Sequence, residues 1–270
     1  MSEVCSALQQ WKLGGRWNTY VLGSGTFEST GSTLRFVTTD TSSRQVTNVQ
    51  VDDYQGLSRR RYLWRPPLTM TVRARFSHPA PDEQGHAHLR GTAGFGFWND
   101  PFLMTGGHWP ALPRAIWFFY ASPPSDIKLD LGVPGYGWKA AMIDASRWSA
   151  LLLAPTAPIA VPLMNLRPVY RKLWPVVQRA IRAREALVPT DMVDWHTYTL
   201  EWGRRSARFC VDGEPVLACD ASPRGPLGFV IWLDNQYLVA TPWGRFRYGL
   251  LSTPGRQWMQ VEALSILPHP

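Results

Sequence analysis

The feature that most constrains the fold is a series of short segments in which apolar residues occupy every second position. In LTMTVRARF, residues 68–76, the apolar side chains fall on one face, and the Thr and Arg side chains fall on the other. This period of two is typical of a β-strand with one buried face. Similar runs bounded by Gly and Pro occur at 32–39, 92–98, 114–122, 195–202, 207–213, 227–234 and 261–267. Many short strands between turn residues predict an all-β fold, a two-sheet antiparallel β-sandwich of the jelly-roll type.

One segment departs from this pattern. Residues 155–189 read PTAPIAVPLMNLRPVYRKLWPVVQRAIRAREALVP, in which Pro175 suits the first turn of a helix and a Val-Pro pair ends it. We expect a single jelly-roll domain over 1–270 with a helical insertion near 160–187. Two interpretations of the insertion stay open: a helix packed over one end of the sandwich, or a basic lid that covers a cleft or transiently touches a membrane surface through 163–187.

Charge and cysteine content bear on partners and compartment. The 270 residues carry 28 basic and 20 acidic side chains, a net charge of +8 that favours acidic partners in general. The basic clusters are short, and no zinc-finger or helix-turn-helix spacing occurs, so we expect no nucleic-acid partner. The opening MSEVCSALQQWKLGG lacks the features of a signal peptide, and the three Cys suit a reducing compartment. We therefore expect a cytoplasmic protein, and the sequence leaves its oligomeric state open.

An Asp-Gly pair at 212–213 predicts a tight hairpin between two strands. A two-residue turn there would place Cys210 opposite Pro215, and Cys219 opposite Ser206. The two thiols would then lie on different cross-strand pairs. We therefore expect no disulfide between them.

No pattern of metal ligands or cofactor-binding residues is present. His108 and His196 have no Cys or second His at a ligand spacing. Gly94 and Gly96 alternate with aromatic residues, which fits packing of a strand under bulky neighbours better than a phosphate-binding loop. We expect neither a metal nor a cofactor.

Two stretches of the chain follow a known order of motifs. In WHTYTLEWGRRSARFCVDGEPV, residues 195–216, a His-Thr-Tyr strand precedes Glu-Trp and a Val-Asp-Gly turn; TMTVRARFSHP and GTAGFGFWND supply two earlier strands. This order resembles the laminarinase-like family-16 glycoside hydrolases, within the concanavalin A-like lectin/glucanase jelly rolls. The resemblance extends from about Leu68 to Ile266, and it implies the same sandwich fold.

The resemblance also identifies a candidate catalytic strand, WPALPRAIWFFYAS, residues 109–122. In the family, Trp-Pro-Ala and two further residues precede a Glu-x-Asp-x-x-Glu strand, whose outer glutamates act as nucleophile and acid/base. The three acids would correspond to Arg114, Ile116 and Phe119, and none of these is acidic. Retaining hydrolysis needs two carboxyl groups about 5 Å apart. We therefore expect no hydrolysis of β-1,3 or β-1,4 glucans by the family's mechanism.

An apolar strand in this place predicts an aromatic cleft that suits a lipophilic or aromatic small molecule. Asp234 is the candidate proton carrier, and Arg114 the candidate anchor for an anionic ligand group. Aromatic faces stabilise cations, so a cyclase or isomerase acting on a lipophilic intermediate is one hypothesis. The alternative is a catalytically inactive carbohydrate-binding protein. Only one of two adjacent strand residues can face the cleft, and the candidate ligand contacts are Phe95, Phe97, Trp98, Trp117, Phe118, Phe119, Trp232, Asn235 and Tyr237.

Overall fold

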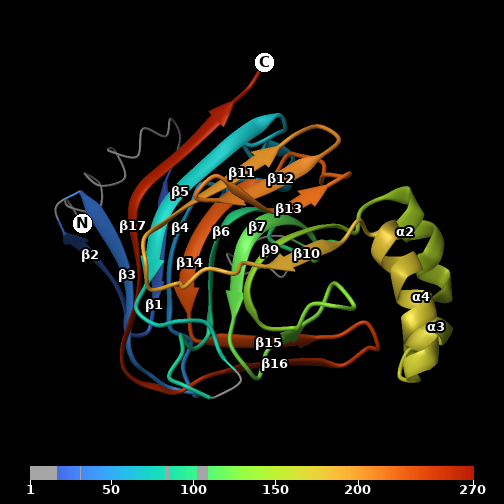
Figure 1. Cartoon of the computed structure of the whole chain (residues 1–270), viewed down its shortest axis with the longest axis horizontal. Helices are drawn as coiled ribbons and strands as arrows, with labels where there is room; N and C mark the ends of the chain where they lie inside the picture. The colour runs from blue at the N-terminus through green and yellow to red at the C-terminus, as the bar shows by residue number, and fades with distance from the viewer. Residues whose placement is uncertain (1–16, 31, 83–84, 102–108) are drawn as a thin grey trace.

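The computed structural model describes residues 17–30, 32–82, 85–101 and 109–270 (Figure 1). Two antiparallel sheets pack face to face, which confirms the predicted β-sandwich with a helical insertion. The N-terminal stretch examined for a signal peptide lies outside the described residues, as does His108.

Sheet A has seven strands in the order β1-β4-β14-β6-β7-β9-β10, and sheet B has seven in the order β13-β12-β11-β5-β17-β3-β2. A three-stranded sheet, β16-β15-β8, lies at one end of the sandwich (Figure 1). The strands of sheet A are β1 (Asn18–Leu22), β4 (Asn48–Asp52), β14 (Gly228–Asp234), β6 (Thr92–Trp98), β7 (Arg114–Ala121), β9 (Gly137–Asp144) and β10 (Arg184–Leu187). Those of sheet B are β13 (Glu214–Cys219), β12 (Ala207–Val211), β11 (His196–Trp202), β5 (Leu68–Phe76), β17 (Thr253–Pro268), β3 (Thr33–Thr41) and β2 (Gly25–Thr30). The third sheet contains β16 (Phe246–Leu250), β15 (Gln236–Ala240) and β8 (Asp126–Ile127).

An apolar core fills the space between sheets A and B. Along β5 every second side chain is buried, as the alternation of LTMTVRARF predicts. Phe95 and Phe97 of β6 and Phe118 of β7 belong to this core, and all three are 0% exposed. Burying large aromatic and aliphatic side chains removes apolar area from water, and this is the main force that holds the sheets together.

The β12–β13 hairpin turns at Asp212 and Gly213, both with positive φ, as predicted for an Asp-Gly turn. Cys210 pairs with Pro215 as expected, but Cys219 pairs with Ala207 rather than Ser206. The register shifts by one residue between Phe209 and Cys210, because a β-bulge adds a residue there. Both thiols are free and buried.

The helical insertion begins earlier than predicted and ends sooner. It contains α2 (Trp148–Leu153), the 3-10 turn η2 (Ala154–Thr156), α3 (Ala157–Leu163) and α4 (Arg167–Ala180); another 3-10 turn, η1, spans Arg59–Arg61. Helix α4 starts at a turn that contains Pro168, so Pro175 lies inside it. Arg182 has a φ of 51°, which stops the helix, and the expected last helical turn is instead strand β10.

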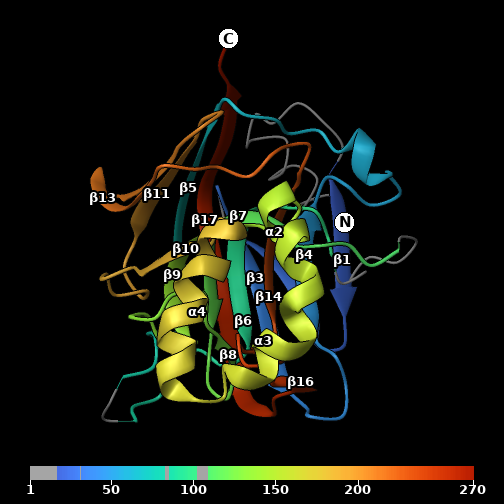
Figure 2. The same ribbon diagram turned by 90° about the vertical axis from the view of Figure 1, so that its right-hand side faces the viewer.

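The insertion lies on the side of sheet A that faces away from sheet B. In Figure 2 its helices stand in front of β6 and β7. Among the described helices, none combines the length and apolar character that crossing a bilayer requires.

Candidate functional site

The face of sheet A that points away from sheet B, called here the outer face, receives alternate side chains of each strand. Along β7, Ile116 and Phe118 point into the inter-sheet core, so Trp117 and Phe119 point to the outer face. The same alternation brings Trp98 of β6 and Trp232 of β14 to this face. Four aromatic rings from three adjacent strands therefore gather at the position of the predicted catalytic strand.

These four residues, Trp98, Trp117, Phe119 and Trp232, form the outer-face aromatic cluster. Ring centroids of Trp117 lie 5.7 Å from Trp98, 5.4 Å from Phe119 and 5.5 Å from Trp232. Trp98, Phe119 and Trp232 are 7 to 8% exposed, whereas Trp117 stays partly exposed. Trp117 is thus the central ring of the cluster and its most exposed one.

Glycines of β6 make room for these rings. A Cβ atom at Gly94 would lie 2.9 Å from Cη2 of Trp232, and one at Gly96 would lie 2.5 Å from Cβ of Trp117. The expectation that these glycines serve strand packing under bulky neighbours is therefore confirmed. Residues with side chains at these two positions would push the rings out of the cluster.

The structure separates the candidate ligand contacts into two groups. Trp98, Trp117, Phe119 and Trp232 belong to the outer-face cluster. Phe95, Phe97 and Phe118 pack between the sheets, so their assignment as ligand contacts is corrected: they are core residues. The reason is strand alternation, which sends each of them to the face opposite its aromatic neighbour.

Asp234 ends β14 on the outer face and is 5% exposed. Its Oδ1 accepts a hydrogen bond from Thr92 Oγ1 at 2.9 Å, and its Oδ2 accepts one from Gln236 Nε2 at 2.8 Å. Thr92 Oγ1 in turn accepts a hydrogen bond from Trp232 Nε1 at 2.9 Å, which links the carboxyl to the aromatic cluster. Burial raises the pKa of Asp234 to about 6, although these hydrogen bonds favour its charged form.

Arg114 lies at the start of β7, on the face opposite Trp117 and Phe119. Its Nη1 donates a hydrogen bond to the carbonyl oxygen of Arg224 at 3.0 Å, and burial lowers the pKa of the guanidinium. Arg114 is therefore not beside the rings, and the expected anchor for an anionic ligand group is not part of this site.

Asn235 and Tyr237 do not join the aromatic cluster either. The Asn235 amide donates to the carbonyl oxygens of Ser42, Gln45 and Leu251 and accepts from Thr47 N–H, so the amide bonds to backbone groups of the neighbouring loops. Tyr237 lies in the third sheet, where the Arg247 guanidinium stacks 5.8 Å from its ring. The assignment of Asn235 as a ligand contact is corrected, because its amide holds loops together.

A polar pocket of about 240 Å³ opens beside the aromatic cluster. Three of its lining residues carry amides whose nitrogens donate to Tyr20 O, Asp52 Oδ2 and Asp234 Oδ2; they are Asn48, Gln50 and Gln236. Gln50 is the cross-strand neighbour of Trp232. Tyr248 donates a hydrogen bond to Gln236 Oε1 at 2.8 Å. The pocket is lined by Tyr20, Leu22, Val46, Asn48, Gln50, Gln236 and Tyr248.

This pocket was not predicted from the sequence, because no strand was expected at β4. The signal is present in NVQVD, residues 48–52, where Val49 and Val51 enter the core and the polar residues alternate with them. Asp52, the last of these, is 0% exposed, and its Oδ2 accepts a hydrogen bond from Gln50 Nε2 at 2.8 Å. Burial raises the pKa of Asp52.

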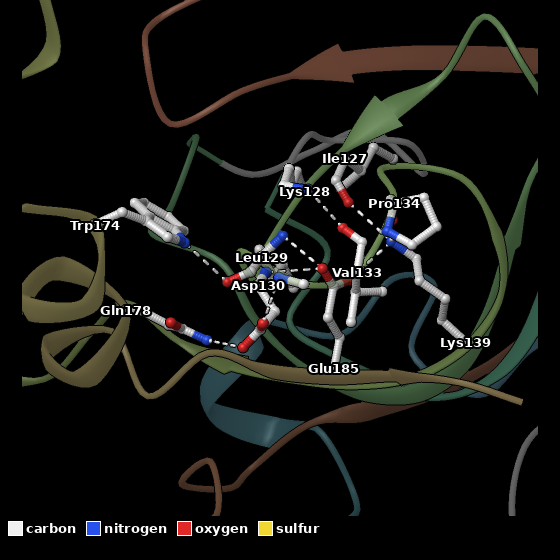
Figure 3. Close-up of polar contacts among 11 residues, drawn as sticks. Ile127, Lys128, Leu129, Asp130, Val133, Pro134, Lys139, Trp174, Gln178 and Glu185 are labelled. Carbon is white, nitrogen blue, oxygen red and sulfur yellow. Dashed lines mark hydrogen bonds and ion pairs between the residues drawn. The ribbon is translucent and has the colours of Figure 1, made fainter. Parts of the chain in front are cut away.

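On the opposite side of the cluster, Lys139 of β9 is the cross-strand neighbour of Phe119 and forms a buried ion pair with Glu185 of β10 (Figure 3). Lys139 Nζ lies 2.8 Å from Glu185 Oε2 and donates further hydrogen bonds to the carbonyl oxygens of Ile127 and Pro134. The two side chains are 1% and 0% exposed. Burial lowers the pKa of Lys139, and the Glu185 charge opposes that change.

Glu185 connects this ion pair to the helical insertion. Its Oε1 accepts hydrogen bonds from the N–H groups of Leu129 and Asp130, both at 2.8 Å. From α4, Trp174 Nε1 donates to the Leu129 carbonyl oxygen and Gln178 Nε2 donates to Asp130 Oδ2 (Figure 3). All donors and acceptors of the pair are thus used within the protein, and the pair positions α4 on the sheet.

No group of three or more metal-binding side chains occurs within the described part of the chain. His196 is structural: its Nδ1 lies 2.6 Å from Asp212 Oδ2, and its Nε2 lies 3.0 Å from the Asp191 carbonyl oxygen. The first contact holds the turn of the β12–β13 hairpin against β11, and the second holds the segment that precedes β11.

Comparisons with known proteins give no match to a family model and none to a curated protein. Solved structures with a similar chain trace include LamA from Z. galactanivorans in complex with laminaritriose and laminaritetraose, at 11% identity over 93% of this chain and 92% of that chain, with a TM-score of 0.49. A laminarinase from Flavobacterium sp. UMI-01 shares 11% identity over 93% and 92%, with a TM-score of 0.47. Crh5 transglycosylase in complex with NAG shares 11% over 94% and 79%, with a TM-score of 0.46. Identities this low carry no information about the side chains of a site in this chain.

Proposed function

We propose that this protein binds an apolar or amphiphilic small molecule on the outer face of sheet A, without hydrolysing it. The observation that supports this is the aromatic cluster, in which Trp117 packs against three more deeply buried rings. Rings held by their neighbours lose little freedom when a flat ligand stacks on them, so they suit apolar recognition. The polar pocket next to Trp232 would receive the hydrophilic end of an amphiphilic ligand.

Binding fits the site better than hydrolysis does. Strand β7, RAIWFFYA, contains no carboxylate, and its outer-face residues are Ala115, Trp117, Phe119 and Ala121. Glycoside hydrolysis by a pair of acids needs two carboxyl groups on either side of the bond that is cleaved. We expect no release of reducing sugar from β-1,3 or β-1,4 glucans.

A cyclase or isomerase needs a group that exchanges a proton with the ligand. Asp234 is the candidate carboxyl, but both of its oxygens accept hydrogen bonds from Thr92 and Gln236. Proton transfer would require one of these bonds to break first. We therefore propose binding as the function and assign Asp234 a positioning role beneath the aromatic cluster.

The polar pocket favours a second candidate, a protein that binds carbohydrate. The rings of Tyr20 and Tyr248 line this pocket, and aromatic rings contact sugars by stacking. This ligand would occupy the pocket at β4 and leave Trp117 uncovered. The two candidates therefore depend on different residues.

Fluorescence titration separates them. N-phenyl-1-naphthylamine, a neutral apolar dye, should bind the wild type, and Trp117→Ala should weaken its binding at least about tenfold by removing the reachable ring. Trp258→Ala is the matched control, since Trp258 is also partly exposed but lies on β17 of sheet B beside Arg35. Dye binding that is equal in both variants would contradict the proposal.

The carbohydrate arm uses laminaritetraose and cellotetraose in isothermal titration. We expect no binding of either by the wild type. Saturable binding that Gln50→Ala abolishes and Trp117→Ala leaves unchanged would establish the second candidate instead.

A further inference from the structure

The helical insertion has a charge pattern found nowhere else in the chain. From Ala145 to Arg184 there is no Asp or Glu, although the whole chain has 20. The same 40 residues include seven basic side chains, and the run WSALLLAPTAPIAVPL, residues 148–163, has no charge at all. The basic residues are Arg147, Arg167, Arg171, Lys172, Arg179, Arg182 and Arg184.

The apolar residues between 148 and 166 are exposed to an unusual degree. Helices α2 and α3 contain no buried residue. Trp148 is 75% exposed, Leu152 76%, Ile159 71% and Leu166 58%. Exposing so many large apolar side chains to water is unfavourable in free energy, so such a patch marks an interaction surface.

The insertion is held firmly on its inner side. Trp174 and Gln178 of α4 bond to the loop at Leu129 and Asp130, and Asn165 Nδ2 donates to the Trp243 carbonyl oxygen at 3.2 Å. The sandwich therefore presents the insertion as a protruding edge of the molecule (Figure 1). The exposed apolar and basic side chains lie on the part that these contacts leave uncovered.

We propose that the helical insertion is a membrane-binding surface and that it binds an anionic phospholipid bilayer. Hydrocarbon would receive Trp148, Leu152 and Ile159, while exposed cations such as Arg171 and Lys172 would contact lipid phosphates and carboxylates. Interfacial helices combine apolar residues, a Trp and flanking basic residues in this way. The inference rests on the insertion alone, so it holds whether or not the outer face of sheet A binds a ligand.

A second copy of this chain is the less favourable occupant. Arg147 and Arg184 already pair with Asp144 and Asp220, which leaves five basic side chains on each insertion. Pairing two insertions would bring these ten together with no acid from either insertion to neutralise them. An anionic bilayer supplies both the apolar phase and the opposite charge. We therefore assign the surface to lipid.

Vesicle co-sedimentation of the full chain tests the proposal. Wild-type protein should bind vesicles of phosphatidylcholine with about 30% phosphatidylserine, bind pure phosphatidylcholine far more weakly, and lose affinity as salt is raised. The double variant Arg171→Gln/Lys172→Gln should bind about thirtyfold more weakly, since each basic residue near an anionic surface contributes about fivefold. Leu152→Ser/Ile159→Ser should weaken binding at least about tenfold.

Matched controls use similar residues away from the insertion. Arg204→Gln/Arg205→Gln removes two exposed charges, and Leu63→Ser/Leu267→Ser removes two exposed Leu side chains that are 45% and 59% exposed. Both controls should bind like the wild type, and circular dichroism should show that every variant is folded. Absence of vesicle binding by the wild type, or equal loss in test and control variants, would overturn the proposal. So would a lipid-free dimer in sedimentation velocity that Leu152→Ser/Ile159→Ser abolishes, because it would show that a second copy covers the surface.

Discussion

At the scale of single residues, Asp234 shows how burial and hydrogen bonding oppose each other. Removal from water raises its pKa to about 6, and hydrogen bonds from Thr92 and Gln236 limit the rise. The carboxyl joins the ends of β14, β6 and β15, and Thr92 connects it to the Trp232 indole. Asp234, the candidate proton carrier in the sequence, thus has a structural role: its hydrogen bonds join strand ends.

The raised pKa of Asp234 predicts a particular pH dependence of stability. The folded-state pKa of about 6 lies above the ordinary value of 3.8, so between these values the folded state binds more protons than the unfolded state. The free energy of unfolding should therefore fall as pH rises through this window, by roughly 3 kcal/mol from this one carboxyl. Asp234→Asn lacks that contribution, so urea unfolding at several pH values should show the variant gaining stability relative to the wild type as pH rises. A wild-type-to-variant difference that does not change with pH would contradict this.

At the scale of elements, one buried ion pair connects two strands, a loop and a helix. Lys139 of β9 and Glu185 of β10 meet in the interior, and Glu185 also accepts hydrogen bonds from the loop at Leu129 to which Trp174 of α4 bonds (Figure 3). Two charges taken from water are stable only when geometry and further hydrogen bonds compensate for lost hydration. Lys139 and Glu185 each have such additional hydrogen bonds.

Breaking this pair from one side should be costly. Lys139→Met leaves the Glu185 carboxylate buried without its cation, and we expect a loss of about 3–5 kcal/mol in the free energy of unfolding. Lys139→Met/Glu185→Gln should recover a large part of the loss, because it leaves no buried charge. Asp220→Asn is the control: it removes the exposed pair with Arg184, also on β10, and should cost less than about 1 kcal/mol. Equal losses for Lys139→Met and Asp220→Asn in urea titrations would show that breaking the buried pair costs no more free energy of unfolding than breaking the exposed pair.

At the scale of the whole molecule, stability is distributed unevenly. The inter-sheet core contains most of the fully buried aromatic rings, whereas α2 and α3 bury no side chain. Segments with little buried apolar area open at low free-energy cost, while central strands open only with global unfolding. The insertion is thus the part of the molecule whose helices depend least on the core.

Hydrogen exchange followed by mass spectrometry should resolve this difference. Amides of β5, β6 and β7 should exchange slowest, and those of α2 and α3 fastest among the regular elements. Helix α4 should be intermediate, because Trp174, Gln178 and Ala180 are buried. Protection of α2 and α3 equal to that of β6 in the isolated protein would mean that another surface covers them.

The sequence by itself determined the features that depend on neighbouring residues. Alternation in LTMTVRARF specifies a half-buried strand, the Asp-Gly pair specifies a hairpin, and the composition of RAIWFFYA excludes a carboxylate from β7. Each of these follows from side-chain period or turn geometry, which act over a few residues. For the same reason, an apolar aromatic patch could be predicted near β7.

Only the tertiary structure decided which side chains face which way and which distant residues meet. In WFFY, residues 117–120, neighbouring residues are equally apolar, so the local pattern cannot tell that Phe118 enters the core and Trp117 the outer face. The position of sheet B decides this. Lys139 and Glu185 are 46 residues apart, and only the β9–β10 pairing brings them together. Which face of a strand is buried, and which distant residues pair, depends on how the sheets pack. The free energy that selects these arrangements comes from burial against elements far away in the chain.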